Sequence, residues 1–312
     1  NNSRRTLSYT GSFFKNGGHL KDLSDNFLRV QREMERTPPD LIISDFEPVL
    51  PRVGRRLNVP FLSLDHQHFL LACDVNEFPS GLRQHALWMR TFIRLFCPEG
   101  PAETVISSFF RYRTRPRYAF AKQVGVMMRK HILEARPEDR GHLIAYVRRP
   151  DTVDLVPQLH ALDHPVRVYG LGKQPRFGNV EFRAIHPTRF LEDLATASAL
   201  VTTAGNQLVG EALYLEKPVF AVPEPNNREQ YINAHFVRAM GVGEASSAGA
   251  LTRDRLASFM EKLPFYRARI NRQRICGNTV AARIIEDHLH GTFAPEAGRL
   301  VPTPLVSRHA VA

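Results

Sequence analysis

The sequence predicts an α/β protein with two doubly wound domains, each built on a parallel sheet. Short apolar runs alternate with longer amphipathic stretches along the chain, which is typical of α/β folds. The strand-like runs are apolar throughout, and this indicates sheets that helices cover on both faces. A length of 312 residues is enough for two domains of ordinary size.

The first half of the chain predicts one domain that begins unusually. The expected strands are 41–44, 59–64 and 104–109, and the expected helices are 24–36, 51–57 and 82–96. A doubly wound domain normally opens with a strand, a glycine-rich turn and a helix, but no such unit precedes Pro38. We therefore expect a first domain that is truncated at its N-terminal side and covers 1–125. Its junction with the next domain is expected near 123–136, within the basic, less regular stretch 111–140.

The second half predicts a more complete domain over 126–265. Its expected strands are 142–147, 166–169, 179–185, 199–203 and 218–222, and its expected helices are 154–162, 190–197, one after Gly205, and 229–240. An arginine-rich helical tail over 264–289 closes the fold. We treat 266–312 as this closing helix and a loose end that follows Gly291.

Composition excludes several classes of protein. The net charge is +11, but no nucleic-acid-binding motif accompanies it, so we expect a basic surface that suits phosphorylated substrates or anionic lipid headgroups and no nucleic-acid partner. The longest uncharged stretch, 194–210, is rich in polar residues and shorter than a membrane helix requires. No signal segment opens the sequence.

The cysteines indicate neither disulfides nor zinc. Cys73, Cys97 and Cys276 are odd in number and show no CxxC spacing. This pattern suits the reducing cytoplasm. No DxD-type pair stands at a plausible position either, so we expect neither a metal nor another cofactor.

The most informative segment runs from Leu200 to Pro223. An apolar strand ends in small residues, turns at Gly205 and enters a helix, so backbone N–H groups and the positive end of the helix dipole lie above the carboxyl edge of the sheet. A diphosphate is the natural occupant, and Gly205 lets the backbone approach it closely. Glu211 on the second turn can accept hydrogen bonds from ribose hydroxyls. The alternative is a plain strand–turn–helix with a surface glutamate.

The next expected strand, 218–222, is also followed by a loop and the start of a helix, at 223–234. One crossover joins the two strands, so they are expected to be neighbours, with both helix starts at the same edge. Glu229, Gln230 and Asn233 lie close together on the second helix and can grip a polyhydroxylated sugar. The alternative is that these residues only cap a solvated helix.

These segments resemble a known family. The patterns TTAGxxxxxEAL, KPVxxxP and EQxxNA, from Thr202 to Ala234, are similar to the donor-binding half of GT-B glycosyltransferases, and most of all to glycosyltransferase family 28 and the lipid II-forming GlcNAc transferase group. PDLIISDFEP (39–48) and LDHQHF (64–69) resemble first-domain segments of the same relatives. The resemblance runs from about Thr37 to about Gly291, and it implies a GT-B fold of two Rossmann-like domains with a cleft between them.

The resemblance implies roles for the donor side. The diphosphate turn would comprise Thr203, Ala204, Gly205, Asn206 and Gln207. Glu211 would bind ribose, Glu229 and Gln230 the donor sugar, and Asn233 phosphate or sugar. The backbone at Ile185 would contact the nucleobase beside His186, and Arg148 or Arg149 would neutralise the diphosphate. The sequence departs from the family in two places. It lacks the glycine-rich first loop of many relatives, and Gly210 stands where a better helix former is usual.

The acceptor side is expected in the first domain. Asp45 and Glu47 follow one strand, and His66 and His68 follow the next, so both pairs are predicted at the carboxyl edge of the sheet. A general base must remove the proton of the acceptor hydroxyl, and imidazole or carboxylate groups can do so near neutral pH. Our order of preference is His66, Glu47, His68 and Asp45. The alternative for each is a cap at the end of its strand.

The sequence therefore predicts a glycosyltransferase that moves a hexosyl or N-acetylhexosaminyl group. The donor would be a nucleoside-diphosphate sugar, and UDP is the first candidate for its nucleoside diphosphate. The acceptor would be a hydroxyl of a lipid-linked, glycolipid or other small molecule. We expect it in the cytoplasm, with a possible peripheral position at the inner face of the membrane. Two alternatives remain open, a non-hydrolysing UDP-sugar 2-epimerase and a catalytically inactive nucleotide-sugar-binding module.

Overall fold

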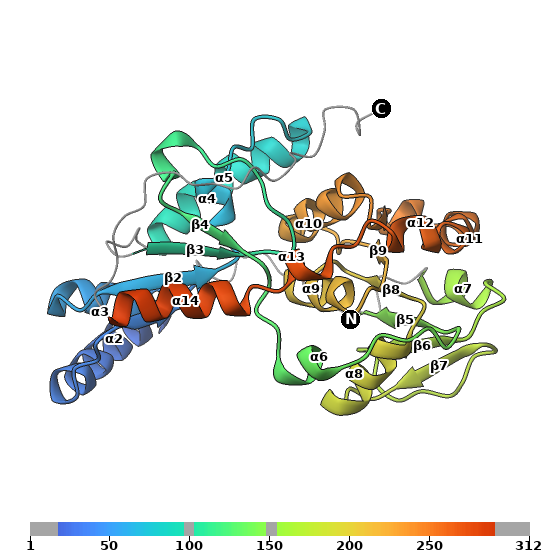
Figure 1. Cartoon of the computed structure of the whole chain (residues 1–312), viewed down its shortest axis with the longest axis horizontal. Coiled ribbons are helices and arrows are strands. Elements are labelled where there is room, and N and C mark those ends of the chain that lie inside the picture. Colours follow the sequence, from blue (N-terminus) through green and yellow to red (C-terminus); the bar gives the residue numbers. More distant parts are fainter. Residues whose placement is uncertain (1–17, 97–102, 148–154, 291–312) are drawn as a thin grey trace. The chain divides into compact units, whose positions relative to one another are not determined.

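A computed structural model describes residues 18–96, 103–147 and 155–290 (Figure 1). These residues form two compact units, each of which has its own parallel sheet. The first unit contains 18–96, 103–106, 113–123 and 281–290, and the second contains 107–112, 124–147 and 155–280. The chain therefore passes between the units more than once, whereas the sequence predicted contiguous domains.

The first unit contains a four-stranded sheet in the order β1-β2-β3-β4. The strands are β1 (Ile42–Ser44), β2 (Phe61–Asp65), β3 (Glu103–Ser107) and β4 (Lys122–Val124). β1 pairs with β2, and β2 with β3, in parallel. The helices are α2 (Gly18–Arg36), α3 (Val49–Leu57), α4 (Phe69–Ala72), α5 (Ser80–Phe96) and α14 (Asn278–Leu289).

Apolar side chains of α2, α3 and the first two strands make one core of this unit. Met34, Val53 and Phe61 are buried in it together with Ile42 and Val49. α2 begins earlier than predicted and ends at Arg36 as expected, before the proline pair. The helix predicted over 24–36 is therefore confirmed, and its apolar face packs on its own unit.

The second unit contains a six-stranded sheet in the order β10-β9-β8-β5-β6-β7, in which all neighbours are parallel. The strands are β5 (Leu143–Tyr146), β6 (Val166–Tyr169), β7 (Val180–Arg183), β8 (Ala199–Thr202), β9 (Val219–Ala221) and β10 (Gly243–Ala245). β8 pairs with β9, so the expected neighbour relation of the two site-bearing strands is confirmed. Both strands are fully buried, as their apolar sequences predicted.

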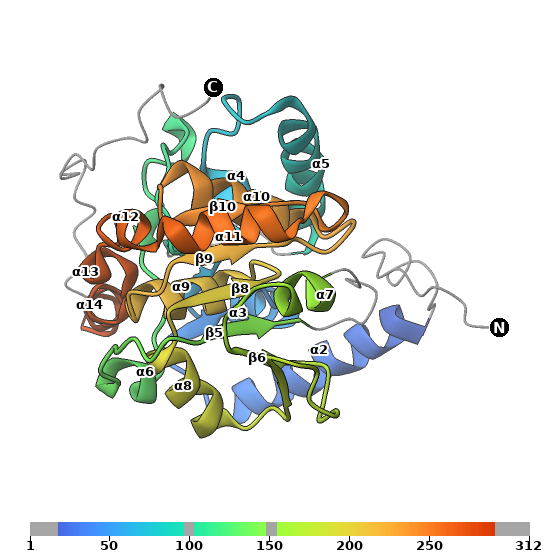
Figure 2. The ribbon, with the colours of Figure 1, turned by 90° about the vertical axis from the view of Figure 1, so that its right-hand side faces the viewer.

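The helices of this unit lie on both faces of the sheet (Figure 2). They are α6 (Lys130–Glu134), α7 (Leu155–His160), α8 (Pro187–Thr196), α9 (Asn206–Tyr214), α10 (Arg228–Ala239), α11 (Arg253–Glu261), α12 (Leu263–Arg267) and α13 (Arg272–Ile275). The main core joins α7 and α11 to the strands through residues such as Leu159, Val168 and Phe259.

The predicted helical tail over 264–289 is wrong as one segment, because it is divided among α12, α13 and α14. Asn271 caps the start of α13 by accepting a hydrogen bond from the amide of Arg274. Just before α14, the backbone at Gly277 lies against the backbone of Gly125. A Cβ at Gly277 would stand 2.1 Å from the carbonyl oxygen of Gly125. This close backbone contact requires glycine and interrupts the helix.

Candidate functional site

The turn between β8 and α9 has a strained backbone that a buried amide holds in place. Ala204 adopts a positive φ of 68° in this turn. Nδ2 of Asn233, a side chain with 0% exposure, donates a hydrogen bond of 3.0 Å to the carbonyl oxygen of Ala204. Such conformations persist for non-glycine residues only where the surroundings fix them. The structure thus places Asn233 behind the turn, as part of its support.

Helix α9 begins without a capping side chain. Gly205 is its N-cap residue and no side chain of the described residues caps it, so the first amide N–H groups of the helix lack an internal acceptor. A Cβ at Gly205 would meet no atom within 4 Å, which means that the space in front of the turn is open. Beside it, the hydroxyl oxygen of Thr202 is buried without a hydrogen-bond partner among the described residues. An anion such as a phosphate suits this place.

Asn206 and Gln207 hold neighbouring chain segments with their side-chain amides. Asn206 donates to the carbonyl oxygen of Ser107 (3.1 Å) and accepts from the amide of Phe109 (3.3 Å). Gln207 donates to the carbonyl oxygen of Met127 (2.9 Å). Their backbone amides remain directed along the start of α9, so the predicted contact with diphosphate is left to the backbone.

Glu211 lies one turn further along the same face and is tied to Arg129. Nε and Nη2 of Arg129 donate to the two carboxylate oxygens at 2.8 and 2.7 Å. Nε2 of Gln207 donates a third hydrogen bond, of 2.8 Å. The predicted ribose-binding carboxylate therefore lies in a forked ion pair that the sequence did not predict, because its partner is 82 residues away.

Gly210 has a steric reason in the structure. A Cβ at this position would stand 2.5 Å from Cγ2 of Val126 and 2.9 Å from its Cβ. Val126 leads directly into the segment that carries Arg129, and it bridges to Cys276 as an isolated β-pair. The glycine weakens the helix locally but lets this segment lie against α9.

The loop before α10 presents two unused polar groups. Asn227 caps the helix by accepting from the amide of Gln230 (3.4 Å), and Oε1 of Gln230 accepts from the amide of Glu224 (2.7 Å). Among the described residues neither Nε2 of Gln230 nor the carboxylate of Glu229 has a hydrogen-bond partner. Glu229 stands in the first turn of the helix and is half-buried. These groups can bind hydroxyls.

Ile185 lies beyond β7, at the same carboxyl edge of the sheet. Its side chain is 60% exposed, which is unusual for isoleucine and offers an apolar surface to a flat ring. Three strand spacings separate β7 from β8, or about 14 Å, which is the length scale of a nucleotide lying along the edge. His186 next to it occupies the N-cap position of α8, and its Nδ1 lies 3.0 Å from Oγ1 of Thr188. Arg148 and Arg149 lie outside the described residues.

In the first unit, Asp65 and His68 form a closed pair at the end of β2. Oδ1 of Asp65 accepts from the amide of His68 (2.9 Å), and Oδ2 lies 2.6 Å from Nδ1 of the imidazole. Both side chains are almost completely buried, and Nε2 of His68 has no hydrogen-bond partner in the described part of the chain. The pair fixes the turn that presents the half-buried His66, whose ring stacks near Phe69.

The other two candidates follow the parallel neighbour β1. Glu47 accepts hydrogen bonds from the amides of Val49 (2.6 Å) and Leu50 (2.8 Å), so it caps the start of α3. Desolvation raises the pKa of Asp45, and the negative charge of Asp65 raises it further. The structure therefore gathers Asp45 and the Asp65–His68 pair at one strand edge and assigns Glu47 a cap.

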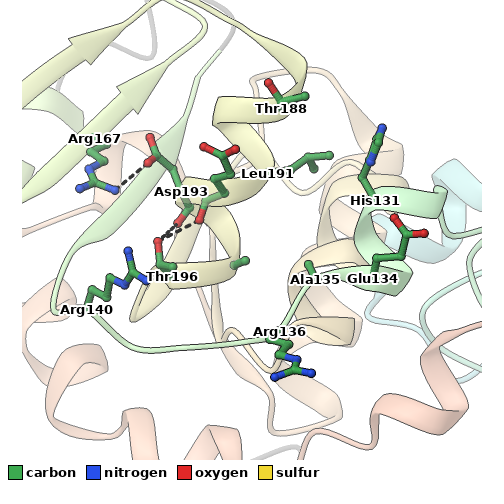
Figure 3. Close-up of a pocket in the computed structure, with 12 residues that line it drawn as sticks. His131, Glu134, Ala135, Arg136, Arg140, Arg167, Thr188, Leu191, Asp193 and Thr196 are labelled. Carbon is green, nitrogen blue, oxygen red and sulfur yellow. Dashed lines mark hydrogen bonds and ion pairs between the residues drawn. The ribbon is translucent and has the colours of Figure 1, made fainter.

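A separate pocket of about 580 Å³ lies between α6 and α8 in the second unit (Figure 3). None of the predicted site residues lines it. Its wall includes Asp193, which accepts a hydrogen bond of 2.7 Å from Arg167 and is also bonded to Arg183 and the Tyr169 hydroxyl. Burial and the bond to Asp193 raise the pKa of Tyr169. This network ties α8 to the sheet.

The described residues offer neither a metal site nor a membrane-spanning helix. They contain no group of three or more His, Cys, Asp or Glu side chains arranged to hold a metal ion. No helix within 18–96, 103–147 or 155–290 is long and apolar enough to span a membrane.

Comparison with known proteins settles the family. The protein-family model described as "Glycosyl transferase family 1" matches residues 4–264 of this sequence. The chain belongs to this family. Its fold is the GT-B fold, which is confirmed by solved structures. The kitacinnamycin glycotransferase superposes with a TM-score of 0.59 at 17% identity, covering 86% of this chain and 81% of its own. MurG of Acinetobacter baumannii gives a TM-score of 0.56 at 15% identity, covering 85% and 77%.

One sequence relative of this family 1 chain is an uncharacterized glycosyltransferase, MK0977, of Methanopyrus kandleri. It is 31% identical over 93 residues, which are 30% of this chain. The match spans about a quarter (24%) of that relative's length. The predicted resemblance to GT-B glycosyltransferases, including a MurG, is thereby confirmed.

Proposed function

We propose that this protein transfers a sugar from a nucleoside-diphosphate donor, with UDP as the first candidate, to an acceptor hydroxyl. One observation supports this most, the uncapped start of α9 behind the open turn at Gly205. The Glu229 carboxylate and Nε2 of Gln230, which lack a hydrogen-bond partner among the described residues, lie on the next helix of the same unit. Anion-binding backbone and sugar-binding side chains on neighbouring strand–helix turns suit one diphosphate-linked sugar.

The transfer breaks the bond between the anomeric carbon and the diphosphate oxygen, while a bond to the acceptor oxygen forms. The amides at the start of α9 and its dipole stabilise the negative charge that grows on the leaving diphosphate. Glu229 and Gln230 hold the sugar hydroxyls. The Ile185 side chain covers the base, and Glu211 accepts from the ribose.

We propose His66 as the general base that takes the acceptor proton. Of the four candidates it combines an imidazole with a partly accessible side chain, whereas His68 is buried and Glu47 serves as a helix cap. The acceptor is proposed to be lipid-linked, a glycolipid or another small hydroxyl compound. The net charge of +11 supports a position against anionic lipid at the cytoplasmic face of a membrane.

A nucleotide panel tests the proposal. UDP at millimolar concentration is expected to raise the melting temperature, since binding to the folded state alone stabilises by RT ln(1 + [L]/Kd). Adenosine, thymidine and guanosine diphosphates run beside it identify the base. A flat response to all of them contradicts the proposed function.

Two substitutions test the division of roles. Glu211→Ala is expected to weaken the binding of bare UDP, whereas Gln230→Ala leaves it nearly unchanged and reduces discrimination among UDP-sugars. Loss of one hydrogen bond to a hydroxyl corresponds to about 0.5–1.5 kcal/mol, and more where a charged group is involved. Equal effects of both substitutions on bare UDP contradict this division.

A further inference from the structure

Arg129 and Glu211 form a pair whose two members differ sharply in exposure. The Arg129 side chain is 51% exposed, while that of Glu211 is 2% exposed. Arg129 stands at the N-cap position of α6, and Glu211 lies on the second turn of α9. The guanidinium therefore forms the outer wall of the place where the carboxylate is buried.

The carboxylate of Glu211 requires this cation. Removing one partner of a buried ion pair leaves a buried charge uncompensated, which is strongly destabilising. The guanidinium supplies a planar fork that matches both carboxylate oxygens. Oε1 accepts from Nε of Arg129 and from Gln207, whereas Oε2 accepts only from Nη2 of Arg129 among the described residues. Each carboxylate oxygen can accept two hydrogen bonds, so Oε2 keeps one position.

The backbone before Arg129 is anchored on three sides, so the guanidinium is presented at a fixed place. Gln207 holds the carbonyl oxygen of Met127. Asn278 accepts from the amide of Met128 (2.7 Å) and donates to its carbonyl oxygen (2.8 Å). Val126 fits against Gly210. A pair anchored in this way is pre-organised, and it does not need to form when a ligand arrives.

We propose that Arg129 is a positioning residue of the donor site. It holds the Glu211 carboxylate in a fixed orientation, so that the open position of Oε2 accepts a hydrogen bond from a ribose hydroxyl of a nucleoside diphosphate. This rests on the proposed function. Arg129 acts through Glu211, and the readout is therefore the recognition of ribose and not nucleotide binding as a whole.

The experiment compares UDP, 2′-deoxy-UDP and 3′-deoxy-UDP by calorimetry on the full chain. The unsubstituted protein is expected to prefer UDP over at least one deoxy compound by about tenfold, as for a hydrogen bond to a charged group. Arg129→Met is expected to bring that ratio below about twofold, and Arg129→Lys to restore it in part. Arg253→Met is the matched control, because Arg253 is similarly exposed (55%) and pairs with a surface aspartate.

Glu211→Gln keeps the test decisive if Arg129→Met does not fold. This variant is expected to lose the preference for UDP by itself, and adding Arg129→Lys is then expected to change the ratio no further. Independent effects of the two substitutions overturn the proposal. So does a Met or Lys variant that keeps the full preference.

The failures of the two proposals differ. If the unsubstituted protein binds none of the three nucleotides, the proposed function falls with this inference. If it binds all three equally, nucleotide binding stands and the role of Arg129 through Glu211 is overturned.

Discussion

Gly210→Ala tests whether a close contact, and not helix propensity, determines the residue at this position of α9. In an isolated helix the substitution stabilises by about 1 kcal/mol. Here the new Cβ would stand 2.5 Å from Cγ2 of Val126 and 2.9 Å from its Cβ, well inside contact distance. Overpacking of this kind costs about 1–3 kcal/mol. The net expectation is a loss of up to about 2 kcal/mol in the free energy of unfolding.

Urea denaturation measures this loss as a lower midpoint at unchanged slope. Gly81→Ala in α5 is the control, because a Cβ there would meet no atom within 4 Å and is expected to be neutral or stabilising. Val126→Ala removes Cγ2 and Cγ1, which would stand 2.5 and 3.2 Å from the new Cβ, but keeps its own Cβ at 2.9 Å, so it relieves the contact only in part. In the double variant Gly210→Ala with Val126→Ala, the loss in the free energy of unfolding is expected to be smaller than the sum of the two single losses, by about 1 kcal/mol or more. A Gly210→Ala protein as stable as the Gly81→Ala control refutes the reasoning.

Three further predictions concern the same elements. Asn233→Ala leaves the buried carbonyl of Ala204 without its donor and is expected to lower the free energy of unfolding by about 1–3 kcal/mol, measured by denaturation. Burial lowers the pKa of Lys217 from 10.5 to about 8, so the unfolded chain binds more protons than the folded one between these pH values. The wild type is therefore expected to gain stability relative to Lys217→Met as the pH rises from about 8 to 10.5. If the free energies of unfolding of the two proteins change in parallel with pH, this prediction is contradicted. His66→Ala is expected to reduce transfer to an acceptor about 10²-fold with unchanged UDP binding, whereas His68→Ala mainly lowers the melting temperature.

The part of the fold that rests on local patterns could be predicted from the sequence. β6 has the predicted ends, and β8, the turn and α9 follow one another as expected, because apolar runs, glycine and helix-start signals lie within a few residues of one another. β10 and α11 were not predicted. β10 is a three-residue edge strand, and pairing with β9 defines it more than its own composition does.

The site shows the same limit more sharply. For Glu47 the alternative reading as a strand-end cap agrees with its observed contacts, since the amides that it binds lie two and three residues ahead. The turn geometry of Asp65 and His68 is equally local.

Glu211 differs, because a resemblance can assign it a ligand but cannot tell which cation pairs with it. Arg129 lies in a stretch that the sequence describes only as basic and irregular, and many other arginines are equal candidates. Arg129 is the arginine that pairs with Glu211 because 126–129 is held against α9. Gln207 and Asn278 hydrogen-bond to this segment, and Gly210 leaves room for it. The glycine that departs from the family pattern and the arginine that no pattern predicted therefore have one explanation. Both let the segment before α6 lie against α9, where the carboxylate needs its partner.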